Sequence, residues 1–423
     1  MLVDLAYGRN GLSVDLPEDR TTVIEPTYVP GLPDEAGAVL GAMRNPIGAP
    51  SLRQLVRADQ TVAISVCDIT RAMPSATVLP LLLGELSHVP TEQIVVLVAT
   101  GTHRPNTPDE LEQMLGREVT EHYRVVNHSA FDKAGLSHVG ETPGGIPIWL
   151  NRHWVESDLR ITTGFVEPHF FAGFSGGPKM VAPGLAGFDT IMRLHNAEMI
   201  AHPNSTWGVT HGNPIHDAIR QIASHVGVDF SVDVTINSDR KITSAYAGEL
   251  HAVHRAGCDV AKRAAMREVN DPFDVVITTN SGYPLDLNLY QSVKGMAAAV
   301  KVVRDGGAII CASECSDGVP DHGEYKEMLT MRDSPEALLE MVCAPGHDRH
   351  DQWEVQVQAQ IQQRATVYLK SGYLSAEETR AAHLEPIEDV GATVGRLLDE
   401  GGPDARLCVL PQGPQTIPFL RGS

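Results

Sequence analysis

The sequence predicts an α/β fold of two domains, and three observations carry that prediction. Short apolar runs typical of buried parallel strands alternate with helical patterns over most of the 423 residues. Three of these runs, which end at residues 66, 99 and 165, lead directly into polar motifs. The alternation starts again after Asn270-Asp271-Pro272, so we place one domain at 1–269 and a second at 270–423.

The first domain is expected to open with a hairpin and to continue as strands and helices. Gly8-Arg9-Asn10-Gly11 supplies turn residues between two short runs, and residues 143–147 suggest a second hairpin turn. Pro74 suits the first turn of a helix, and Thr107-Pro108-Asp109-Glu110 is typical of a helix start. Strands are expected at 60–66, 93–99, 159–165, 230–236 and 241–246. Helices are expected at 34–44, 74–85, after 107–110, at 214–226 and, rich in alanine, at 250–269.

The second domain repeats the pattern of strand and helix. Strands are expected at 274–278 and 307–312, with a helix between them at 288–303. The stretch 352–369 is rich in glutamine and predicts an amphipathic helix. Residues 409–419 end in an irregular, proline-containing sequence.

Composition excludes several classes of function. The net charge of -20, from 33 basic and 53 acidic residues, opposes binding to nucleic acid or to an anionic membrane surface. No apolar run approaches the ~20 residues of a membrane helix. The first 19 residues show no signal-peptide pattern. The six cysteines form no CxxC pair, so we expect reduced thiols in a cytoplasmic protein.

The stretch 164–195 carries the chemically most versatile side chains. It is too rich in glycine and proline for a regular helix. We therefore expect a loop whose conformation is fixed by the groups around which it folds. His169 is a potential base, Lys179 a potential point of covalent attachment and His195 a potential metal ligand. The alternative is a glycine-rich connection with ordinary core histidines.

Polar motifs follow all three of the apolar strands. The strands run into Asp68-Ile69-Thr70-Arg71, into Gly101-Thr102-His103-Arg104 and into the segment that contains His169. Ligands of open α/β sheets bind outside the carboxyl ends of parallel strands. We therefore expect Asp68, Arg71, His103 and His169 to converge, although polar residues also follow strands simply because loops are polar.

One further set of polar residues lies in the second domain. Tyr290, Gln291 and Lys294 fall within one predicted helix, and Tyr290 and Lys294 share a face of it. The alternative is that Lys294 merely extends its ammonium group to water from an otherwise apolar helix.

Taken together, these motifs resemble the nickel-dependent lactate racemase family. The resemblance rests on DITRAMP (68–74), ATGTHRP (99–105), EPHFFAGFSGGPKMVAPG (167–184), His195 and YQSVKG (290–295). The motifs occur in one order and cover nearly the whole chain. The long segment 167–184 is far more specific than a short glycine-rich turn.

The resemblance implies a cofactor, a nickel-pincer nucleotide, which is the nickel complex of pyridinium-3,5-bisthiocarboxylic acid mononucleotide. It implies attachment through Lys179, nickel ligation by His195 and a cofactor contact from Asp68, with Trp353 as an aromatic of the site. Gly176 and Gly177 are expected to let the backbone approach this group and its phosphate. A protein made without the cofactor-synthesis enzymes, its expected transient partners, would lack it.

The resemblance also implies a reaction, the inversion of a 2-hydroxy acid in a cleft between the two domains. In the reaction that the resemblance implies, the cofactor would accept hydride from C2 and return it to the other face of a 2-keto acid. His103 and His169 match the two opposed acid/base histidines, which suits the pKa range of imidazole. Residues that bind the substrate are implied at Arg71, Lys294, Tyr290 and Gln291, with Arg71 and Lys294 on the carboxylate.

Other functions remain open from the sequence. Lactate, malate, longer or aromatic hydroxy acids and sugar acids are all candidate substrates. A zinc hydrolase could use some of the 18 histidines, but the sequence contains no zinc-binding spacing such as HExxH. A pyridoxal-phosphate enzyme could use Lys179, and a noncatalytic protein could bind nickel or a nucleotide. The sequence leaves the oligomeric state undetermined.

Overall fold

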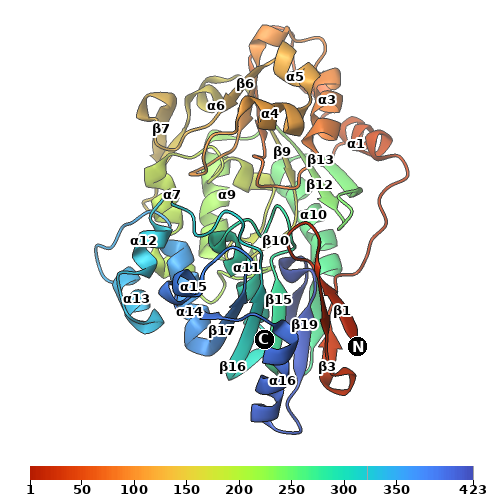
Figure 1. The fold of residues 1–423 in the computed structure, drawn as a ribbon. Coiled ribbons are helices and arrows are strands. Elements are labelled where there is room, and N and C mark those ends of the chain that lie inside the picture. The colour runs from red at the N-terminus through yellow and green to blue at the C-terminus, as the bar shows by residue number, and fades with distance from the viewer. Residues whose placement is uncertain (322, 423) are drawn as a thin grey trace. The chain divides into compact units, whose positions relative to one another are not determined.

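The chain folds into two compact units that interleave along the sequence. The computed structural model describes residues 1–321 and 323–422 (Figure 1). Unit 1 comprises Met1–Thr27, Asn196–Ala201 and Ala265–Ser423, and unit 2 comprises Tyr28–His195 and His202–Ala264. The first 27 residues thus pack with the C-terminal part of the chain. The single boundary predicted between residues 269 and 270 does not describe this interleaving. The assignment of separate functions to 1–269 and 270–423 stays a prediction.

Unit 2 is built on a six-stranded sheet of order β13-β12-β9-β4-β5-β6. All neighbours are parallel except β12 and β13, which form an antiparallel edge pair. The strands are β4 (Val62–Val66), β5 (Ile94–Val98), β6 (Arg124–Asn127), β9 (Leu159–Phe165), β12 (Phe230–Ile236) and β13 (Ile242–Gly248). Two antiparallel hairpins join them, β7 (Leu136–Glu141) with β8 (Pro147–Asn151) and β10 (Pro168–His169) with β11 (Gly173–Phe174).

Helices connect the strands of unit 2. They are α1 (Glu35–Arg44), α2 (Leu52–Leu55), α3 (Ser75–Glu85), α4 (Pro108–Leu115), α5 (Arg117–His122), α6 (Arg152–Glu156), α7 (Phe188–Leu194), α9 (Pro214–Val226) and α10 (Leu250–Ala265). Short 3-10 turns are η2 (Thr91–Gln93), η3 (Lys133–Gly135) and η4 (Gly177–Met180). Thr107 closes a reciprocal capping box with Glu110 at the start of α4, which confirms the predicted helix start.

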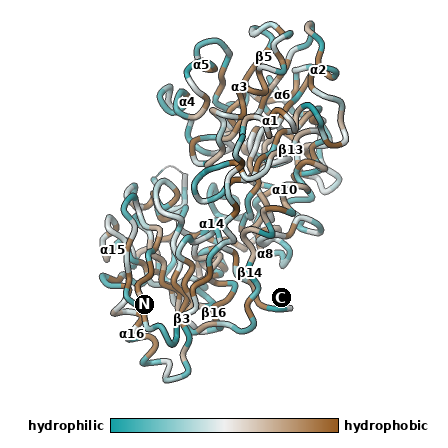
Figure 2. Tube along the Cα trace, turned by 90° about the vertical axis from the view of Figure 1, so that its right-hand side faces the viewer, coloured by the Kyte–Doolittle hydropathy of each residue, from teal (hydrophilic) through white to brown (hydrophobic). Residues whose placement is uncertain are grey.

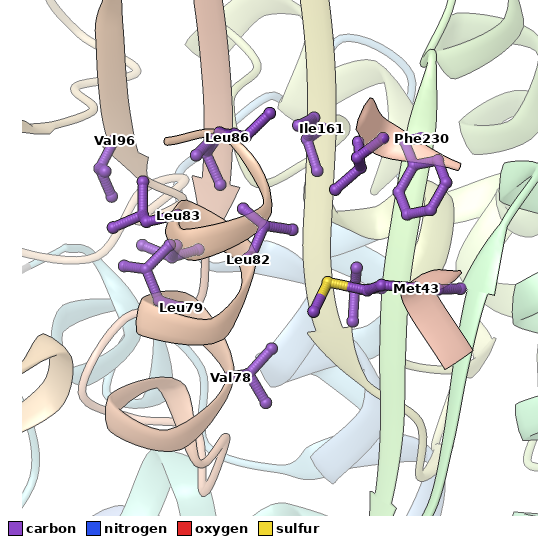
Figure 3. Close-up of a cluster of buried hydrophobic side chains, with 14 of the residues drawn as sticks. Met43, Val78, Leu79, Leu82, Leu83, Leu86, Val96, Ile161 and Phe230 are labelled. Carbon is purple, nitrogen blue, oxygen red and sulfur yellow. The ribbon is translucent and has the colours of Figure 1, made fainter. Parts of the chain in front are cut away.

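The two faces of the unit 2 sheet differ in polarity. On one face, Ile161 and Val96 pack with Leu79 and Leu82 of α3 and with Met43 of α1 (Figure 3). Side chains of a strand alternate between faces. The neighbouring positions therefore lie on the other face, which carries the buried polar residues Ser65, Thr162, Ser231 and Asp233. This polar face receives the segment that contains Lys179.

Unit 1 is built on a second six-stranded sheet, parallel throughout, of order β18-β17-β16-β15-β19-β3. The strands are β3 (Thr21–Val23), β15 (Phe273–Thr279), β16 (Val303–Ala312), β17 (Ala365–Lys370), β18 (Glu385–Pro386) and β19 (Leu407–Leu410). The helices are α8 (Ala197–Ala201), α11 (Leu289–Ala299), α12 (Tyr325–Leu329), α13 (Pro335–Val342), α14 (Gln352–Arg364), α15 (Ala376–Ala381) and α16 (Val390–Gly401), with 3-10 turns η1 (Glu18–Arg20) and η5 (Gly413–Gln415). The predicted N-terminal hairpin is confirmed as β1 (Leu2–Leu5) with β2 (Leu12–Asp15).

The core of unit 1 also has two sides. Val275 and Ile277 of β15 pack with Val394 of α16 and with the β1-β2 hairpin, and the alternate residues face the side of α11 and α14. In Figure 2 the strands near the labels β3 and β16 are brown, as buried parallel strands should be. Four strands and helices that position the site, β4, β5, β9 and α9, are confirmed within two residues of their predicted bounds.

Three helices were predicted to be too long, because a strand that pairs with a distant part of the chain begins within or at the end of each predicted stretch. The predicted helix 250–269 ends at Ala265, and β14 (Met266–Val269) pairs in parallel with β20 (Ile417–Leu420). The end of the stretch 409–419, which was predicted to be irregular, therefore runs into a strand, β20. The predicted helix 352–369 ends at Arg364 because β17 joins the sheet beside β16. The predicted helix 288–303 ends at Ala299, since β16 begins at Val303.

The glutamines of α14 also correct the amphipathic prediction. Gln352, Gln356 and Gln358 are buried, and their amides have internal roles. Gln356 donates to the carbonyl of Ala197 and Gln358 to that of Ala382. Buried amides need such partners, so the glutamine content reflects internal hydrogen bonds and not a solvent-facing side.

The sequence predicted no membrane-spanning helix and reduced cysteine thiols. Over the described residues, no helix has both the length and the apolar character that crossing a bilayer requires. All six cysteines are free thiols, with Cys343 exposed and the other five buried.

Candidate functional site

The segment 164–184 crosses the polar face of the unit 2 sheet. Ser65 Oγ on β4 donates a 2.7 Å hydrogen bond to the carbonyl of Met180. The backbone N–H of Gly177 donates to Asp233 Oδ1 on β12 at 3.3 Å. Strands β4 and β12 flank β9, the strand that leads into the segment. The sheet itself therefore fixes the path of the residues around Lys179.

Two glycines allow this close crossing. A Cβ on Gly164 would lie 2.9 Å from Asp233 Oδ1 and 3.1 Å from the Cα of Gly176. Gly177 has φ +50°, and a Cβ there would lie 2.6 Å from the ring of His254. Glycine is therefore required by the protein's own packing. The expected approach of Gly176 and Gly177 to a cofactor phosphate stays a prediction.

His103 and Asp68 meet at the carboxyl ends of β5 and β4. His103 Nδ1 lies 2.6 Å from Asp68 Oδ2, and Thr70 Oγ1 donates to Asp68 Oδ1 at 2.7 Å. Burial alone would raise the pKa of Asp68, but the charge and hydrogen bond of His103, helped by Arg71 and Thr70, lower it to about 2. Asp68 is therefore a carboxylate that holds the proton of His103 on Nδ1. The lone pair of that ring then lies on Nε2.

The loop of His103 is joined to the segment of Lys179. The N–H of Gly101 donates to the carbonyl of Gly184 at 3.0 Å, and the N–H of Gly184 donates to the carbonyl of Lys179 at 3.1 Å. Arg71 belongs to the same neighbourhood, because its backbone N–H donates to the carbonyl of Asp68 at 3.1 Å. The structure thus brings together Asp68, Arg71 and His103, three of the four residues that were expected to converge, while the approach of His169 to them stays a prediction.

Phe171 is the centre of a second group of predicted residues. Its ring lies 4.6 Å from that of His169 and 5.2 Å from that of His195, both edge-on. Lys179 Nζ lies 6.0 Å from the centroid of the same ring. One aromatic side chain therefore contacts or adjoins the predicted base, metal ligand and attachment point.

His195 has the features of a metal-ligating histidine. It follows α7, is buried, and donates from Nδ1 to the carbonyl of Ile191 at 2.8 Å. Its pKa is lowered to about 4, chiefly by burial; the hydrogen bond to the Ile191 carbonyl raises it and the nearby charge of Lys179 lowers it. The ring is therefore neutral at pH 7 with its lone pair on Nε2, the form in which histidine binds metals.

His169 has the opposite protonation pattern to His103. It lies on β10, pairs with Gly173 of β11, and accepts the N–H of Ala172 at its Nδ1, at 3.3 Å. In the neutral ring the proton is then on Nε2. His103 and His169 thus differ in which ring nitrogen carries the proton.

The predicted residues of unit 1 form a group of their own. Lys294 Nζ donates to Gln291 Oε1 at 2.5 Å on α11, and Trp353 Nε1 donates to the hydroxyl of Tyr290 at 2.9 Å. Lys294 is half-buried and hydrogen-bonded, so the alternative that it simply extends to water does not hold. Glu354, buried beside Trp353, was not predicted. Burial raises its pKa, while the charge of Lys294 lowers it.

A metal site made by protein side chains alone has no candidate here. Among the described residues, no three histidine, cysteine, aspartate or glutamate side chains converge to hold an ion.

Several buried residues around the segment 164–184 have no distinctive sequence pattern. They lie outside the conspicuous motifs, on α9, α10 and β12 or just before α9: Asn213, His216, Asp233 and His254. A histidine on the apolar face of a helix gives little signal, because core histidines are common. Phe171 was visible in the motif but indistinguishable from a core aromatic.

Comparisons with known proteins extend over the whole chain. Residues 7–208 match the lactate racemase N-terminal domain and residues 269–417 the lactate racemase C-terminal domain. The chain is 34% identical to the lactate racemase of Thermoanaerobacterium thermosaccharolyticum over 98% of both chains. It is 34% identical to that of Lactiplantibacillus plantarum, covering 95% of this chain and 98% of the relative.

Solved structures agree with this similarity. The lactate racemase apoprotein from T. thermosaccharolyticum matches with a TM-score of 0.92 at 33% identity, over 99% of this chain and all of the other. A protein from Thermotoga maritima matches with a TM-score of 0.71 at 19% identity, over 93% of this chain and all of the other, which concerns the fold alone.

Proposed function

The chain belongs to the lactate racemase family, and we propose that it inverts C2 of lactate or a related 2-hydroxy acid as a nickel-dependent isomerase. The observation that carries the proposal is the arrangement around Phe171, which His169 and His195 contact and Lys179 adjoins. A base, a metal donor and an amine beside one aromatic ring are what the reaction requires.

The residues fit a nickel-pincer nucleotide attached through Lys179. His195 is neutral and has committed its Nδ1 proton to Ile191, so its other nitrogen suits a metal. With no protein cluster of three donors among the described residues, the further donors would come from the attached group. When bound, that group would supply a carbon that accepts hydride from C2 and returns it, with a 2-keto acid between the two transfers.

His103 and His169 are the acid and base of the proposal. Asp68 fixes the proton of His103 on Nδ1, so Nε2 can accept the hydroxyl proton of the substrate. His169 carries its proton on Nε2 and can donate it to the oxygen of a keto acid. One ring is thus ready to accept and the other to donate, which an inversion needs. Asp68 also stabilises the imidazolium that forms on His103.

Arg71 and Lys294 are the cations that we assign to the substrate carboxylate. Arg71 can bind a carboxylate through two parallel hydrogen bonds, whereas Lys294 supplies a point charge oriented by Gln291. A chain of net charge -20 needs such local positive charge to bind an anion. We assign Tyr290, Gln291 and Trp353 to the surroundings of the substrate, and we expect cofactor-synthesis enzymes as transient partners in the cytoplasm.

A deuterium experiment tests both the reaction and its route. Cofactor-loaded protein is incubated with single enantiomers of 2-hydroxy acids that carry deuterium at C2, and the products are separated by chiral chromatography. Inversion with deuterium retained at C2 is expected, because hydride returns to the carbon that it left. Inversion with loss of deuterium to water would contradict the hydride route, and no inversion of any acid would contradict the racemase assignment.

The loaded protein also separates the alternatives. Its intact mass should exceed the sequence mass by one cofactor, and the modified peptide should contain Lys179. An absorbance spectrum of a pyridoxal aldimine would support the pyridoxal-phosphate alternative instead. An adduct on another lysine of an active protein would contradict the role of Lys179.

A further inference from the structure

Two buried histidines of unit 2 donate hydrogen bonds to the backbone between His169 and Lys179. His216 on α9 donates from Nδ1 to the carbonyl of Ala172 at 3.0 Å. His254 on α10 donates from Nε2 to the carbonyl of Ser175 at 2.9 Å. We propose that His216 and His254 are positioning residues, which hold this backbone in the conformation that places the His169 imidazole and the Lys179 ammonium.

The two rings form one rigid unit. They are stacked, with centroids 5.3 Å apart and planes inclined by 16°. Both side chains are almost completely buried. Burial lowers the pKa of His216 to about 3 and that of His254 to about 4, so both rings are neutral at pH 7. A neutral imidazole has one N–H, and each ring gives its N–H to a carbonyl of the segment.

His216 acts on His169 through Ala172. The carbonyl of Ala172 accepts from His216, and the N–H of the same residue donates to His169 Nδ1 at 3.3 Å. Ala172 also adjoins Gly173, which pairs with His169 in the β10-β11 hairpin. A shift of Ala172 therefore moves the hydrogen bond that sets which nitrogen of His169 carries the proton.

His254 acts on the turn before Lys179. The carbonyl of Ser175 accepts from His254, and the ring itself fills the space beside Gly177, where a Cβ would be 2.6 Å away. Cys258, one helical turn along α10, places its Sγ 3.7 Å from His254 Nδ1 and 3.6 Å from Nε2, so the sulfur packs against the ring. The imidazole is thus held by its hydrogen bond to Ser175 and by packing against Cys258, and it supports the turn that leads into η4.

Neighbouring side chains complete the support. Asn213, which caps α9, donates to the carbonyl of Phe171 at 2.8 Å, and Asp233 accepts the N–H of Gly177. Four buried side chains thus bind Phe171, Ala172, Ser175 and Gly177 in turn. Residues 171–177 thus accept or donate four hydrogen bonds with buried side chains, and such bonds hold a reactive loop in one conformation.

The inference rests on the proposed function only for its effect on catalysis, and its test begins with the apoprotein. The variants are His216→Leu and His254→Leu, which remove the donor, and His216→Gln and His254→Gln, which keep one. His128→Leu is the matched control, since His128 is also buried and neutral and donates to a carbonyl, that of Ala186 at 2.9 Å. Urea unfolding measures the stability of each variant.

Two readouts on the apoprotein report position. Ring-nitrogen NMR shifts give the tautomer of His169, and the rate of Lys179 acetylation against pH, followed by peptide mass spectrometry, gives its apparent pKa. We expect His216→Leu to change the His169 signature and His254→Leu to change the Lys179 profile, with the Gln variants close to wild type. His128→Leu should lose stability and change neither. In loaded protein, the Leu variants should lower kcat by about 10- to 100-fold with KM nearly unchanged.

Leu variants that match His128→Leu in both apoprotein readouts would overturn the inference and leave the histidines as ordinary core residues. Should a Leu variant fail to fold, His216→Asn or His254→Asn replaces it, because the shorter amide stays polar but falls short of the carbonyl. A loaded wild type that inverts no 2-hydroxy acid would contradict the proposed function, while the His169 and Lys179 readouts would still decide the positioning role.

Discussion

His103 Nδ1 lies 2.6 Å from Asp68 Oδ2, across the ends of two neighbouring parallel strands. The carboxylate is 4% exposed and its pKa is lowered to about 2, so it stays ionised throughout the working range of an imidazole base. It fixes the orientation of the ring and favours the imidazolium that forms when Nε2 takes a proton.

Asp68→Asn should therefore lower kcat by about 10²- to 10⁴-fold with little change in KM. An amide cannot stabilise the imidazolium, although it can keep a hydrogen bond. Kinetics of loaded protein check this, normalised to the fraction of chains that carry an adduct on Lys179. Asp158→Asn is the control, because Asp158 accepts from Thr61 near the start of β4, at the opposite edge of the sheet. A kcat within twofold of wild type would leave Asp68 without a part in proton transfer.

Lys294→Met should raise KM for the 2-hydroxy acid roughly tenfold or more, because a hydrogen bond to a charged group contributes about 1.5–3 kcal/mol. Lys294→Arg keeps the charge, so its KM should lie between the KM of Lys294→Met and that of wild type. Lys262→Met on the exposed part of α10 is the control for loss of one charge. An unchanged KM in Lys294→Met would remove this lysine from substrate binding.

His195→Ala should lose nickel while it keeps the adduct on Lys179. The ring is neutral and its Nδ1 proton is already bound to Ile191, so the metal donor is Nε2. Nickel per chain is measured by elemental analysis beside the intact mass, and circular dichroism checks the fold. His202→Ala, at an exposed histidine seven residues along, should keep its nickel. Equal nickel in both variants would refute the ligand assignment.

Asp233→Asn should change how stability depends on pH. Burial raises the pKa of Asp233 from 3.8 to about 7, and the hydrogen bond from Gly177 lowers it less. Between these two values the unfolded chain releases a proton that the folded chain keeps, so wild type loses stability as pH rises through this window. Relative to wild type, the asparagine variant should gain stability by about 1.4 kcal/mol per pH unit there. The free energy of unfolding of both proteins is measured with urea at pH 4 to 7. If it changes with pH in the same way in wild type and Asp233→Asn, the raised pKa is contradicted.

The sequence by itself determined most of the local elements and the motifs that make up the candidate site. Strand β9 and helix α9 have the predicted bounds, because apolar periodicity and clear caps specify them without distant contacts. Asp68 and His103 follow adjacent buried strands, so the parallel arrangement predicted their meeting. The family was also evident, since the segment 167–184 is long and chemically distinctive.

The tertiary structure alone decided what depends on distant pairing and on burial. Residues 266–269 continue a helical sequence pattern but form β14, because hydrogen bonds to residues 417–420 outweigh local propensity. Phe171 was one apolar residue among many until its ring proved to adjoin His169, Lys179 and His195. His216 and His254 come from separate helices, and only packing could stack their rings and aim each N–H at one loop. The physical reason is that sequence patterns report on neighbours along the chain, whereas a buried polar side chain is defined by its partner across the fold.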